Sequence, residues 1–451
     1  MPDPITTPTS IRVSPHSYFV FLFISTFFAA FVLYLGYDLS AAILVLLICP
    51  TAIGLMWRDR LVFDGKRIRR TGLVLRIWSY FYGLRDRLKL SDIEQVETQA
   101  MRALKRGGRV FYRYRTSIRG KGVTFSFASG NGDYLAMIRA ILPKLPDDVL
   151  DNRSMELRDY LADRREIVMK AKTSNIPPAD VLENAFTDIR SKKNRMEDVV
   201  SGSPNEAEEL RRLANELRVT GSLWQAVETF RRAARVRPKD GWLLFEFARC
   251  LQSLAGSERD QRLERRAAAM MRLSERRAHE DPELLARLGE NYFQIGDWRR
   301  AGIVFQRAVD GFGESFRALR GMAEIALREG KIAHVIHNFS AASERAETAS
   351  LRRWTKAEVD YFSRLNDDEE YMELEVSRVS LLDSLTTAKR TVLRLAMLGF
   401  PLILIGLLFE ETLVANIGWA VSGISLAIWI SVMFLQKLLA PRIPFELTRE
   451  E

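Results

Sequence analysis

The chain of 451 residues has a formal net charge of +10, is 47% hydrophobic and 27% charged, and contains two cysteines, Cys49 and Cys250. This composition excludes a disordered chain. The lack of a cysteine framework excludes a small disulfide-stapled scaffold and favours a reducing compartment. A length of this order allows about three domains.

Two apolar stretches at the N-terminal end predict a pair of membrane-spanning helices. Residues 18–37 and residues 39–57 contain no charged side chain, and each is long enough to cross a hydrocarbon core of about 30 Å. Only a short turn separates them, and aromatic side chains stand at their ends, where amphipathic rings favour the membrane interface. We therefore expect residues 18–57 to form a transmembrane hairpin.

The positive charge of the chain is concentrated directly after this hairpin. Residues 58–121 contain 18 Lys and Arg but 6 Asp and Glu, which indicates a local anionic partner. The cations closest to the apolar stretch are candidates for binding lipid headgroups: Arg58, Arg60, Lys66, Arg67, Arg69 and Arg70. The alternative is a solvated strand face that only fixes membrane topology. Nucleic acid is not expected as a partner, because core packing explains the alternating aromatic residues here better than base stacking does.

Residues 58–146 predict a small antiparallel β domain closed by one C-terminal helix. Asp64-Gly65 is a hairpin dipeptide between two short strands. Residues 78–101, 109–118 and 122–129 have the composition of further strands, with a turn at Gly107-Gly108, and helical spacing follows at residues 133–145. Together with Gly72 and residues 88–97, this order resembles the bacterial pleckstrin-homology-like domains that follow a two-helix membrane hairpin, over residues 61–145. The resemblance implies a membrane-proximal scaffold without catalysis.

A helical linker is predicted for residues 147–204. Residues 147–172 are charged and amphipathic, Pro177-Pro178 breaks the pattern, and residues 179–192 predict another helix.

Residues 205–346 carry a helical repeat. In a 34-residue frame that starts at Ala207, the signature positions hold Leu213, Ala214, Leu217, Gly221, Ala226, Phe230, Ala233 and Pro238. The frame recurs from Pro282 and, less completely, from Phe316. A diverged copy lies between, about seven residues too long for the frame, with an extended turn or helix expected near residues 256–266. Over residues 207–346 the chain resembles the tetratricopeptide repeat family, which implies stacked helix pairs that bind peptides or partner helices on a concave face.

The resemblance places this concave face on fixed positions of each first helix. The candidates for partner binding are Arg211, Asn215, Arg218, Glu290, Phe293, Arg320, Glu324 and Arg328. Arg211 and Asn215 match the pair that grips a chain-terminal carboxylate in chaperone-binding members, but Glu246 stands where a complete clamp would need Asn. We therefore expect a polar ligand segment rather than a full clamp; the alternative is a solvated face.

Helical patterns continue to the C-terminal end. Residues 347–390 predict capping or connector helices with an acidic break at residues 367–370. The apolar stripe Met372, Val376, Val379, Leu382 and Leu385 is expected to cap the solenoid and to run directly into the next span. Residues 391–436 predict a second transmembrane hairpin that turns at Glu410-Glu411. Lys and Arg flank the inner ends of both hairpins and are missing from their turns, so the positive-inside rule predicts cytoplasmic termini and a cytoplasmic middle.

Signatures of catalysis, metal binding or cofactor binding are missing from the sequence. His334 and His337 are three residues apart, but no Cys or well-placed carboxylate completes a metal site. P-loop, GxSxG, HExxH and dinucleotide motifs are also missing. The predicted spans hold no Asp, Glu, Lys or His near mid-depth, which argues against an ion pathway. Neither an enzyme nor a transporter is expected, and no cofactor.

These elements predict a multi-domain membrane protein with two transmembrane α-helical hairpins, a small antiparallel β domain with one C-terminal helix, and an α-helical tetratricopeptide solenoid. The expected function is a scaffold or adaptor in a bacterial inner membrane that recruits or assembles partner proteins at the cytoplasmic face. The alternative is a lipid-reading regulator whose basic β domain binds anionic headgroups and controls the solenoid.

Overall fold

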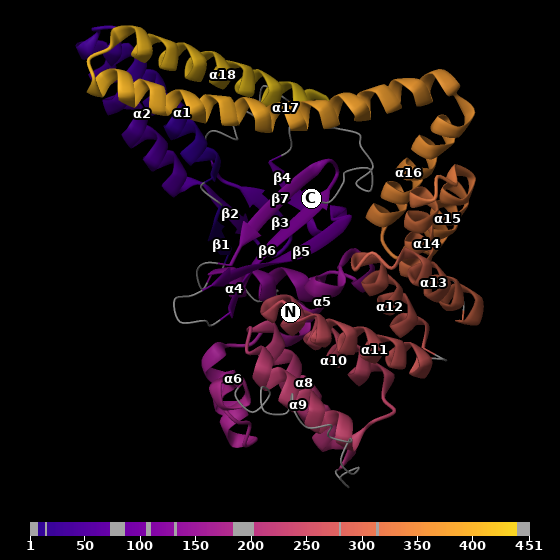
Figure 1. The fold of residues 1–451 in the computed structure, drawn as a ribbon. Coiled ribbons are helices and arrows are strands. Elements are labelled where there is room, and N and C mark those ends of the chain that lie inside the picture. Colours follow the sequence, from indigo (N-terminus) through magenta and orange to yellow (C-terminus); the bar gives the residue numbers. More distant parts are fainter. Residues whose placement is uncertain are drawn as a thin grey trace. The chain divides into compact units, whose positions relative to one another are not determined.

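The computed structural model describes residues 8–13, 16–72, 86–104, 110–129, 133–183, 203–278, 281–312 and 315–439. Outside this range lie the predicted strand residues 78–85, the turn at Gly107-Gly108 and the helix of residues 179–192 beyond residue 183. Figure 1 shows the helices and strands of the chain, which forms two compact units. The first comprises Met1–Pro15, Gly54–Ile325 and His337–Ala357; the second comprises His16–Ile53, Ala326–Ile336 and Glu358–Glu451.

The β domain of the first unit contains two antiparallel sheets. One has the order β1 (Thr9–Arg12), β2 (Arg60–Phe63), β3 (Arg67–Arg70) and β4 (Arg87–Lys89); the other has the order β5 (Gln95–Leu104), β6 (Val110–Gly120) and β7 (Val123–Ala128). The β2–β3 hairpin turns at Asp64-Gly65, as predicted. Gly65 has φ of 93°, and Asp64 Oδ1 accepts a hydrogen bond from the Arg67 N–H at 2.7 Å.

The strand β1 comes from before the first apolar helix, outside the range expected for the β domain. It pairs with β2 so that Arg12 stands opposite Arg60. Ile11 and Leu61, the next pair along, are 4% and 1% exposed. Both ends of the segment that holds the first two apolar helices therefore lie side by side in one sheet.

One hydrophobic core fills the β domain and continues into the helical repeat. Alternate strand residues such as Ile68 and Ile118 point inward, and α4 (Asp133–Ile141) closes the core with Met137 and Ile138. Side chains from the last helix pair, including Leu319, belong to the same cluster. The β domain and the repeat are therefore parts of one compact unit.

Four helix pairs form the tetratricopeptide-like repeat that the sequence predicted. They are α8 (Pro204–Val219) with α9 (Leu223–Val236), α10 (Gly241–Glu258) with α11 (Gln261–Arg277), α12 (Pro282–Gln294) with α13 (Trp298–Phe312), and α14 (Phe316–Arg328) with α15 (Ile332–Arg345). The turns of three pairs contain Gly221, Gly296 and Gly330, whose φ values are 88°, 85° and 72°. Glycine adopts this left-handed conformation without steric cost, which explains the signature residue.

Small residues allow the helices to approach closely, and aromatic rings fill the space between them. The Phe305 ring of α13 lies against Gly289 of α12 and Gly321 of α14. A Cβ atom added at these glycines would lie 2.6 Å and 2.3 Å from ring atoms. Ala214 and Ala226 of the first pair are fully buried.

Near residues 256–266 the sequence predicted an extended turn or an extended helix, and the diverged second pair has longer helices and no extended turn. Its helices have 18 and 17 residues, against 13 and 15 in the third pair. Only Arg259 and Asp260 separate them; Arg259 has φ of 52°, and Asp260 caps α11 by accepting the Arg262 N–H at 2.8 Å. The extra residues therefore lengthen the helices.

The beginning of α16 (Ala349–Asp367) covers the last helix pair. Trp354 packs edge-on against Phe339 of α15 at 5.8 Å, and the Arg320 guanidinium lies 5.3 Å from the Trp354 ring. The apolar stripe that was expected to cap the solenoid belongs instead to the next helix, α17 (Glu369–Leu408), where Val376 is 63% exposed.

The second unit contains the apolar helices α1 (His16–Tyr34) and α18 (Thr412–Leu439), all of α17, and α2 (Asp38–Arg58) as far as Ile53. Because α17 is continuous over 40 residues, the connector and the predicted third span form one helix. It packs antiparallel to α18 through small residues: Ser422 Oγ donates to the Ala396 carbonyl at 3.0 Å, and a Cβ on Gly399 would collide with Ser422 Oγ. The Phe27 ring of α1 lies 5.1 Å from that of Trp419.

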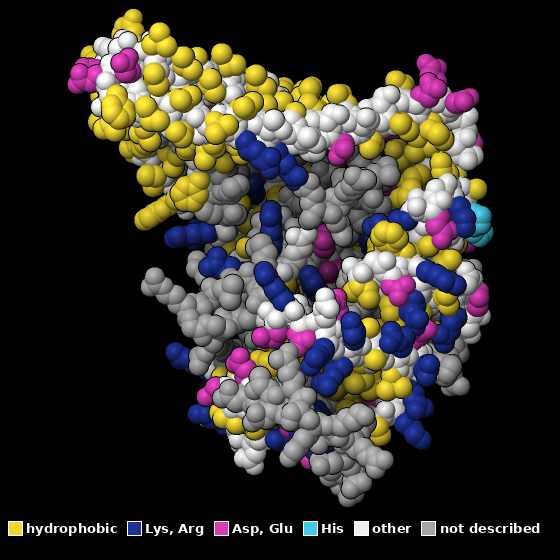
Figure 2. All heavy atoms as spheres, viewed as in Figure 1, with side chains coloured by type: hydrophobic (Ala, Val, Ile, Leu, Met, Phe, Trp, Pro, Cys, Tyr) yellow, Lys and Arg dark blue, Asp and Glu magenta, His cyan; other side chains and the backbone are white. Residues whose placement is uncertain are grey.

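Three helices are long and apolar enough to cross a membrane: Asp38–Arg58, Glu369–Leu408 and Thr412–Gln436. Tyr18–Tyr34 is apolar but shorter. Only 11% to 28% of the most apolar windows of the three long helices is buried inside the protein. Figure 2 shows hydrophobic side chains gathered over α18 and the C-terminal half of α17.

Candidate functional site

The first helices of the four pairs present a common surface, which we call the concave face. A segment of the same chain, residues 147–161, lies on it; we call this the inner segment. It contains the 3-10 turn Asp147–Val149 and α5 (Asn152–Tyr160). Its side chains or backbone contact α8, α10, α12 and α14 through hydrogen bonds or ion pairs. The sequence had suggested only a linker here.

Arg317 of α14 holds the beginning of the inner segment. Its Nη2 donates to the carbonyl oxygens of Asp147 at 2.9 Å and Leu150 at 3.2 Å, and its Nη1 pairs with Glu290 of α12 at 2.7 Å. Glu290 also accepts the Asn152 N–H at 3.3 Å. Of these two side chains, Glu290 was predicted to face a ligand and Arg317 was not named; both contact α5 or the turn before it.

Glu156 is the central contact of the inner segment. Its carboxylate pairs with Arg218 of α8 at 2.9 Å and with Arg249 of α10 through a shorter contact. All three side chains are at most 12% exposed. Burial by itself raises the pKa of Glu156, but the two guanidinium groups outweigh it, so that this pKa is lowered. Arg218 and Arg249 thus form a buried site for a carboxylate, and a carboxylate of the same chain occupies it.

The Arg211–Asn215 pair also holds a carboxylate, that of Glu246 on α10. Arg211 donates two hydrogen bonds to it, at 2.6 Å and 2.8 Å, and Asn215 Nδ2 donates a third at 2.8 Å. The Tyr160 hydroxyl of α5 donates to the same carboxylate at 3.2 Å. Glu246, which the sequence analysis treated as a departure from the clamp, is therefore what the clamp residues grip.

The opposite side of the inner segment packs on the β domain. Asp151 caps α5 by accepting the Ser154 N–H at 2.9 Å and also accepts the Thr98 N–H of β5 at 3.3 Å. Ser154 Oγ lies 2.8 Å from Thr98 Oγ1, and Met155 is fully buried. Burial first, and then the charge of Glu290, raise the pKa of Asp151 to about 7.

The remaining concave-face candidates have contacts within the repeat and with α16. Phe293 is half-buried against the core of the second and third pairs. Arg320 forms an ion pair with Glu324 at 2.9 Å on α14, and Arg328 is exposed near the end of that helix. Partner binding by any of the candidates stays a prediction. Beside α5 a cavity of about 250 Å³ remains, lined by residues that include Arg211, Trp242 and Arg287.

The lipid-headgroup candidates divide into two groups. Arg58, Arg60, Lys66, Arg67 and Arg69 are exposed. Arg70 instead forms two hydrogen bonds, at 3.0 Å and 2.6 Å, to Asp59, which is 1% exposed. A Cβ on Gly72 would lie 2.6 Å from the same carboxylate. Arg70 is therefore a structural cation that holds the strand after α2.

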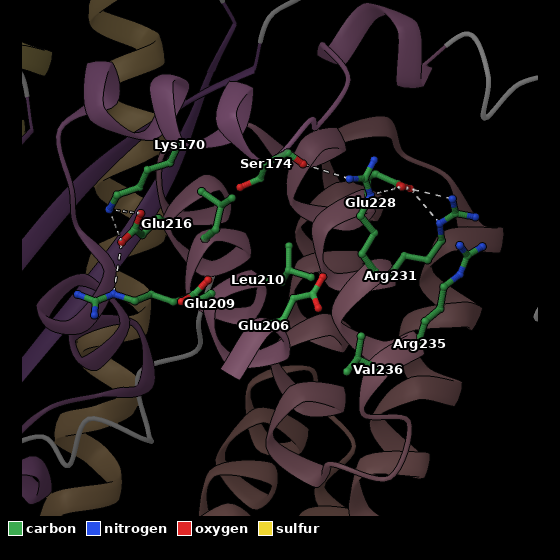
Figure 3. Close-up of a pocket in the computed structure, with 13 residues that line it drawn as sticks. Lys170, Ser174, Glu206, Glu209, Leu210, Glu216, Glu228, Arg231, Arg235 and Val236 are labelled. Atoms are coloured by element: carbon green, nitrogen blue, oxygen red, sulfur yellow. Dashed lines mark hydrogen bonds and ion pairs between the residues drawn. The ribbon is translucent and has the colours of Figure 1, made fainter. Parts of the chain in front are cut away.

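A second open feature is a polar groove of about 1030 Å³ between α6 (Arg164–Thr173), α8 and α9 (Figure 3). Glu206 and Glu209 of α8 line one wall, and Arg231 and Arg235 of α9 line the other. Leu210 and Val236 add apolar surface. Sequence reasoning missed this groove because it is formed at the end of the solenoid by a linker helix, α6, that has no place in the repeat pattern.

Within the described ranges, no group of three or more His, Cys, Asp and Glu side chains is close enough to hold a metal ion. The contacts of the concave face are ion pairs and hydrogen bonds that hold polypeptide, and the grooves beside it are lined by charged side chains of both signs. Such surfaces are suited to binding another chain.

No protein-family profile matches the sequence, and no curated protein sequence matches it. Solved structures with some likeness include MamA from Desulfovibrio magneticus RS-1, at 17% identity over 40% of this chain and 92% of that chain, with a TM-score of 0.26. Another is TTC0263, a thermophilic TPR protein of Thermus thermophilus, at 16% identity over 45% and 97%, with a TM-score of 0.29. The APC/C Cut9–Hcn1 hetero-tetramer matches at 15% identity over 68% of this chain and 52% of that chain, with a TM-score of 0.29. At such TM-scores these likenesses say nothing about function.

Proposed function

We propose that the protein is a membrane-anchored scaffold that presents a tetratricopeptide-like repeat to helical segments of partner proteins. The observation that carries this proposal is the inner segment: α8, α10 and α12 hold a helix of the same chain through Glu156, Tyr160 and Asn152, and α14 holds the turn before that helix. The repeat is therefore a surface that binds a helix through charged and polar contacts.

Membrane anchoring is supported by the exposed apolar surface of the long helices in the second unit. Side chains such as Leu46 and Leu408 are 76% and 77% exposed, and water does not favour continuous apolar surface of this extent. Because β1 pairs with β2, the segment between these strands, which contains α1 and α2, has to begin and end on the same side of the membrane. The Lys and Arg bias then favours the cytoplasmic side for the β domain and the repeat.

The partner site that we propose is the groove of Figure 3, since the inner segment fills the centre of the concave face. In a helical repeat, the outer side of the first pair is where another helix can continue the stack. The groove suits an amphipathic helix with basic residues toward Glu206 and Glu209, acidic residues toward Arg231 and Arg235, and an apolar stripe on Leu210.

A photo-crosslinking amino acid at Val236 of the full-length protein, expressed in its own cells, tests this site. We expect one reproducible crosslinked protein, and loss of that crosslink when Glu206→Arg and Glu209→Arg reverse the acidic wall. The matched control is Glu258→Arg with Glu264→Arg, two exposed acids on the second pair, which should leave the crosslink unchanged. A crosslink that survives reversal of the acidic wall would refute the proposed site.

A further inference from the structure

The sheet β1–β4 carries a row of like charges on its outer face. Ile11, Leu61, Ile68 and Leu88 point into the core, so their strand neighbours point away from it. Across the strands, Arg12 stands opposite Arg60, Arg67 opposite Lys89, and Arg69 opposite Arg87. All six of these side chains are exposed. The register thus adds Arg12, Arg87 and Lys89 to the cations named from the sequence.

Like charges directly opposite each other destabilise a sheet, so their arrangement needs an explanation outside the fold. Arg60, Arg67, Arg69 and Lys89 form no ion pair within 4 Å in the part of the chain that the structure describes, and the charge of Asp64 in the hairpin turn acts on Arg67 and Arg69 from a greater distance. Arg87 has a weak, exposed contact at 3.4 Å with Asp86, and Arg12 lies 5.8 Å from the Trp57 ring. Where the fold does need a cation, at Arg70, it provides the buried partner Asp59.

The chain connects this face directly to the apolar helices. Arg12 is four residues before α1 begins at His16, and Arg60 is two residues after α2 ends at Arg58. At about 3.3–3.6 Å per extended residue, the two arginines stay within about 15 Å of those helix ends. The screening length is about 8 Å at physiological salt. Arg60, which lies within about 7 Å of the end of α2, is therefore close enough for an anionic membrane surface at that end to act on it, whereas the limit for Arg12 is about twice the screening length.

We propose that the outer face of β1–β4 binds the anionic phospholipid headgroups of the bilayer that holds α1 and α2. This inference rests on the proposed membrane anchoring and adds the chemistry of the surface that the β domain meets. Each basic residue near such a surface strengthens binding about fivefold. The six cations of the outer face would hold the β domain against the leaflet.

The test uses the full-length protein, with Cys49→Ala and Cys250→Ala, in a series of nanodiscs of neutral lipid whose anionic fraction is raised in steps from zero. A fluorophore on Val62→Cys, between the charged pairs of the outer face, is quenched by a lipid with a nitroxide headgroup. We expect quenching to increase with anionic lipid and to fall in about 1 M salt, where the screening length is about 3 Å.

The variant Arg67→Glu, Arg69→Glu, Arg87→Glu should shift the anionic fraction needed for half-maximal quenching upward by at least about fivefold. The matched control, Arg265→Glu, Arg272→Glu, Arg276→Glu on α11, changes net charge equally at exposed positions and should not shift it. Incorporation into discs with no response to anionic lipid, or an equal response in both variants, would overturn this inference alone. Failure to incorporate would overturn membrane anchoring as well. A response to single-stranded DNA but not to anionic lipid would assign the face to nucleic acid instead.

Discussion

At the scale of single residues, Glu156 is the contact on which the inner segment depends most. Its carboxylate compensates two buried guanidinium groups, Arg218 and Arg249, which come from different helix pairs. A buried ion pair is weak evidence for net stability, because desolvation offsets much of the attraction, but removing one partner leaves an uncompensated buried charge.

We therefore predict that Glu156→Gln lowers the free energy of unfolding by about 3–5 kcal/mol, measured by chemical denaturation of the detergent-solubilised chain. Glu209→Gln, an exposed acid on α8, should change it by less than about 0.5 kcal/mol. Equal effects of the two substitutions would show that Glu156 does not seat the inner segment.

Asp151 predicts how stability depends on pH. An unfolded chain ionises Asp near the usual value of 3.8, whereas the folded protein keeps this proton up to about pH 7. Between these values the folded state binds the extra proton, so the free energy of unfolding should fall as pH rises from about 4 to about 7 and then level off. Asp148, with a pKa raised to about 6 by burial and by Glu347, acts in the same direction.

Asp151→Asn keeps an oxygen to accept the Ser154 and Thr98 N–H groups but cannot titrate. Denaturation is measured from pH 5 to pH 7.5. Over this range the free energy of unfolding of the variant should fall less steeply with pH than that of the parent, by the slope that corresponds to about one bound proton. An unchanged slope would mean that Asp151 ionises normally in the folded protein.

The sequence predicted the role of a residue only where a repeat pattern assigns one to its position. Arg211 and Asn215 were recognised as carboxylate-binding, because they occupy fixed positions of a repeat. The ion pair of Arg70 with Asp59 was not predicted. A hairpin separates the two residues, and only the register of β2 and β3 brings them together.

At the scale of elements, the contact of Phe305 with two glycines links three consecutive helices of the repeat. Gly321→Ala would place a Cβ 2.3 Å from the ring, and overpacking of this kind costs about 1–3 kcal/mol. We predict a lower free energy of unfolding for Gly321→Ala, with partial recovery when Phe305→Leu makes room.

The matched control for this prediction is Gly256→Ala on α10, where a Cβ would meet nothing within 4 Å. It should stabilise the helix by up to about 1 kcal/mol, because alanine loses less backbone entropy than glycine. Destabilisation by Gly256→Ala as large as by Gly321→Ala would contradict the packing described for Phe305.

The helix pairs could be predicted because small and large residues recur at the positions where the two helices of each pair contact each other. α5 could be predicted as a helix but not as a ligand of the repeat, since its partners on α8, α10, α12 and α14 lie far away in sequence. β1 was missed for a different reason: four residues give too little alternation to identify a strand, and only pairing with β2 forms it.

At the scale of the whole molecule, the order in which the chain enters and leaves the apolar helices predicts the side of the membrane on which the β domain and the repeat lie. The segment from α1 to α2 starts and ends in the sheet β1–β4, and α17 with α18 form an antiparallel pair that returns to the level of Arg378, which donates to the Leu439 carbonyl at 2.8 Å. In each pair of apolar helices, the second helix therefore runs back toward the beginning of the first. The β domain and the repeat, which share one core, are expected on the same side of the membrane.

Substituted-cysteine labelling of intact cells tests whether the β domain and the repeat lie on the cytoplasmic side and the two helix turns on the opposite side. In a Cys49→Ala, Cys250→Ala background, single cysteines replace Asp38 and Glu411 in the two turns and Met169 on α6, which is 69% exposed. We predict that a membrane-impermeant thiol reagent labels the two turn positions in intact cells and labels position 169 only after permeabilisation. Labelling of position 169 in intact cells, or equal protection of all three positions, would contradict the account.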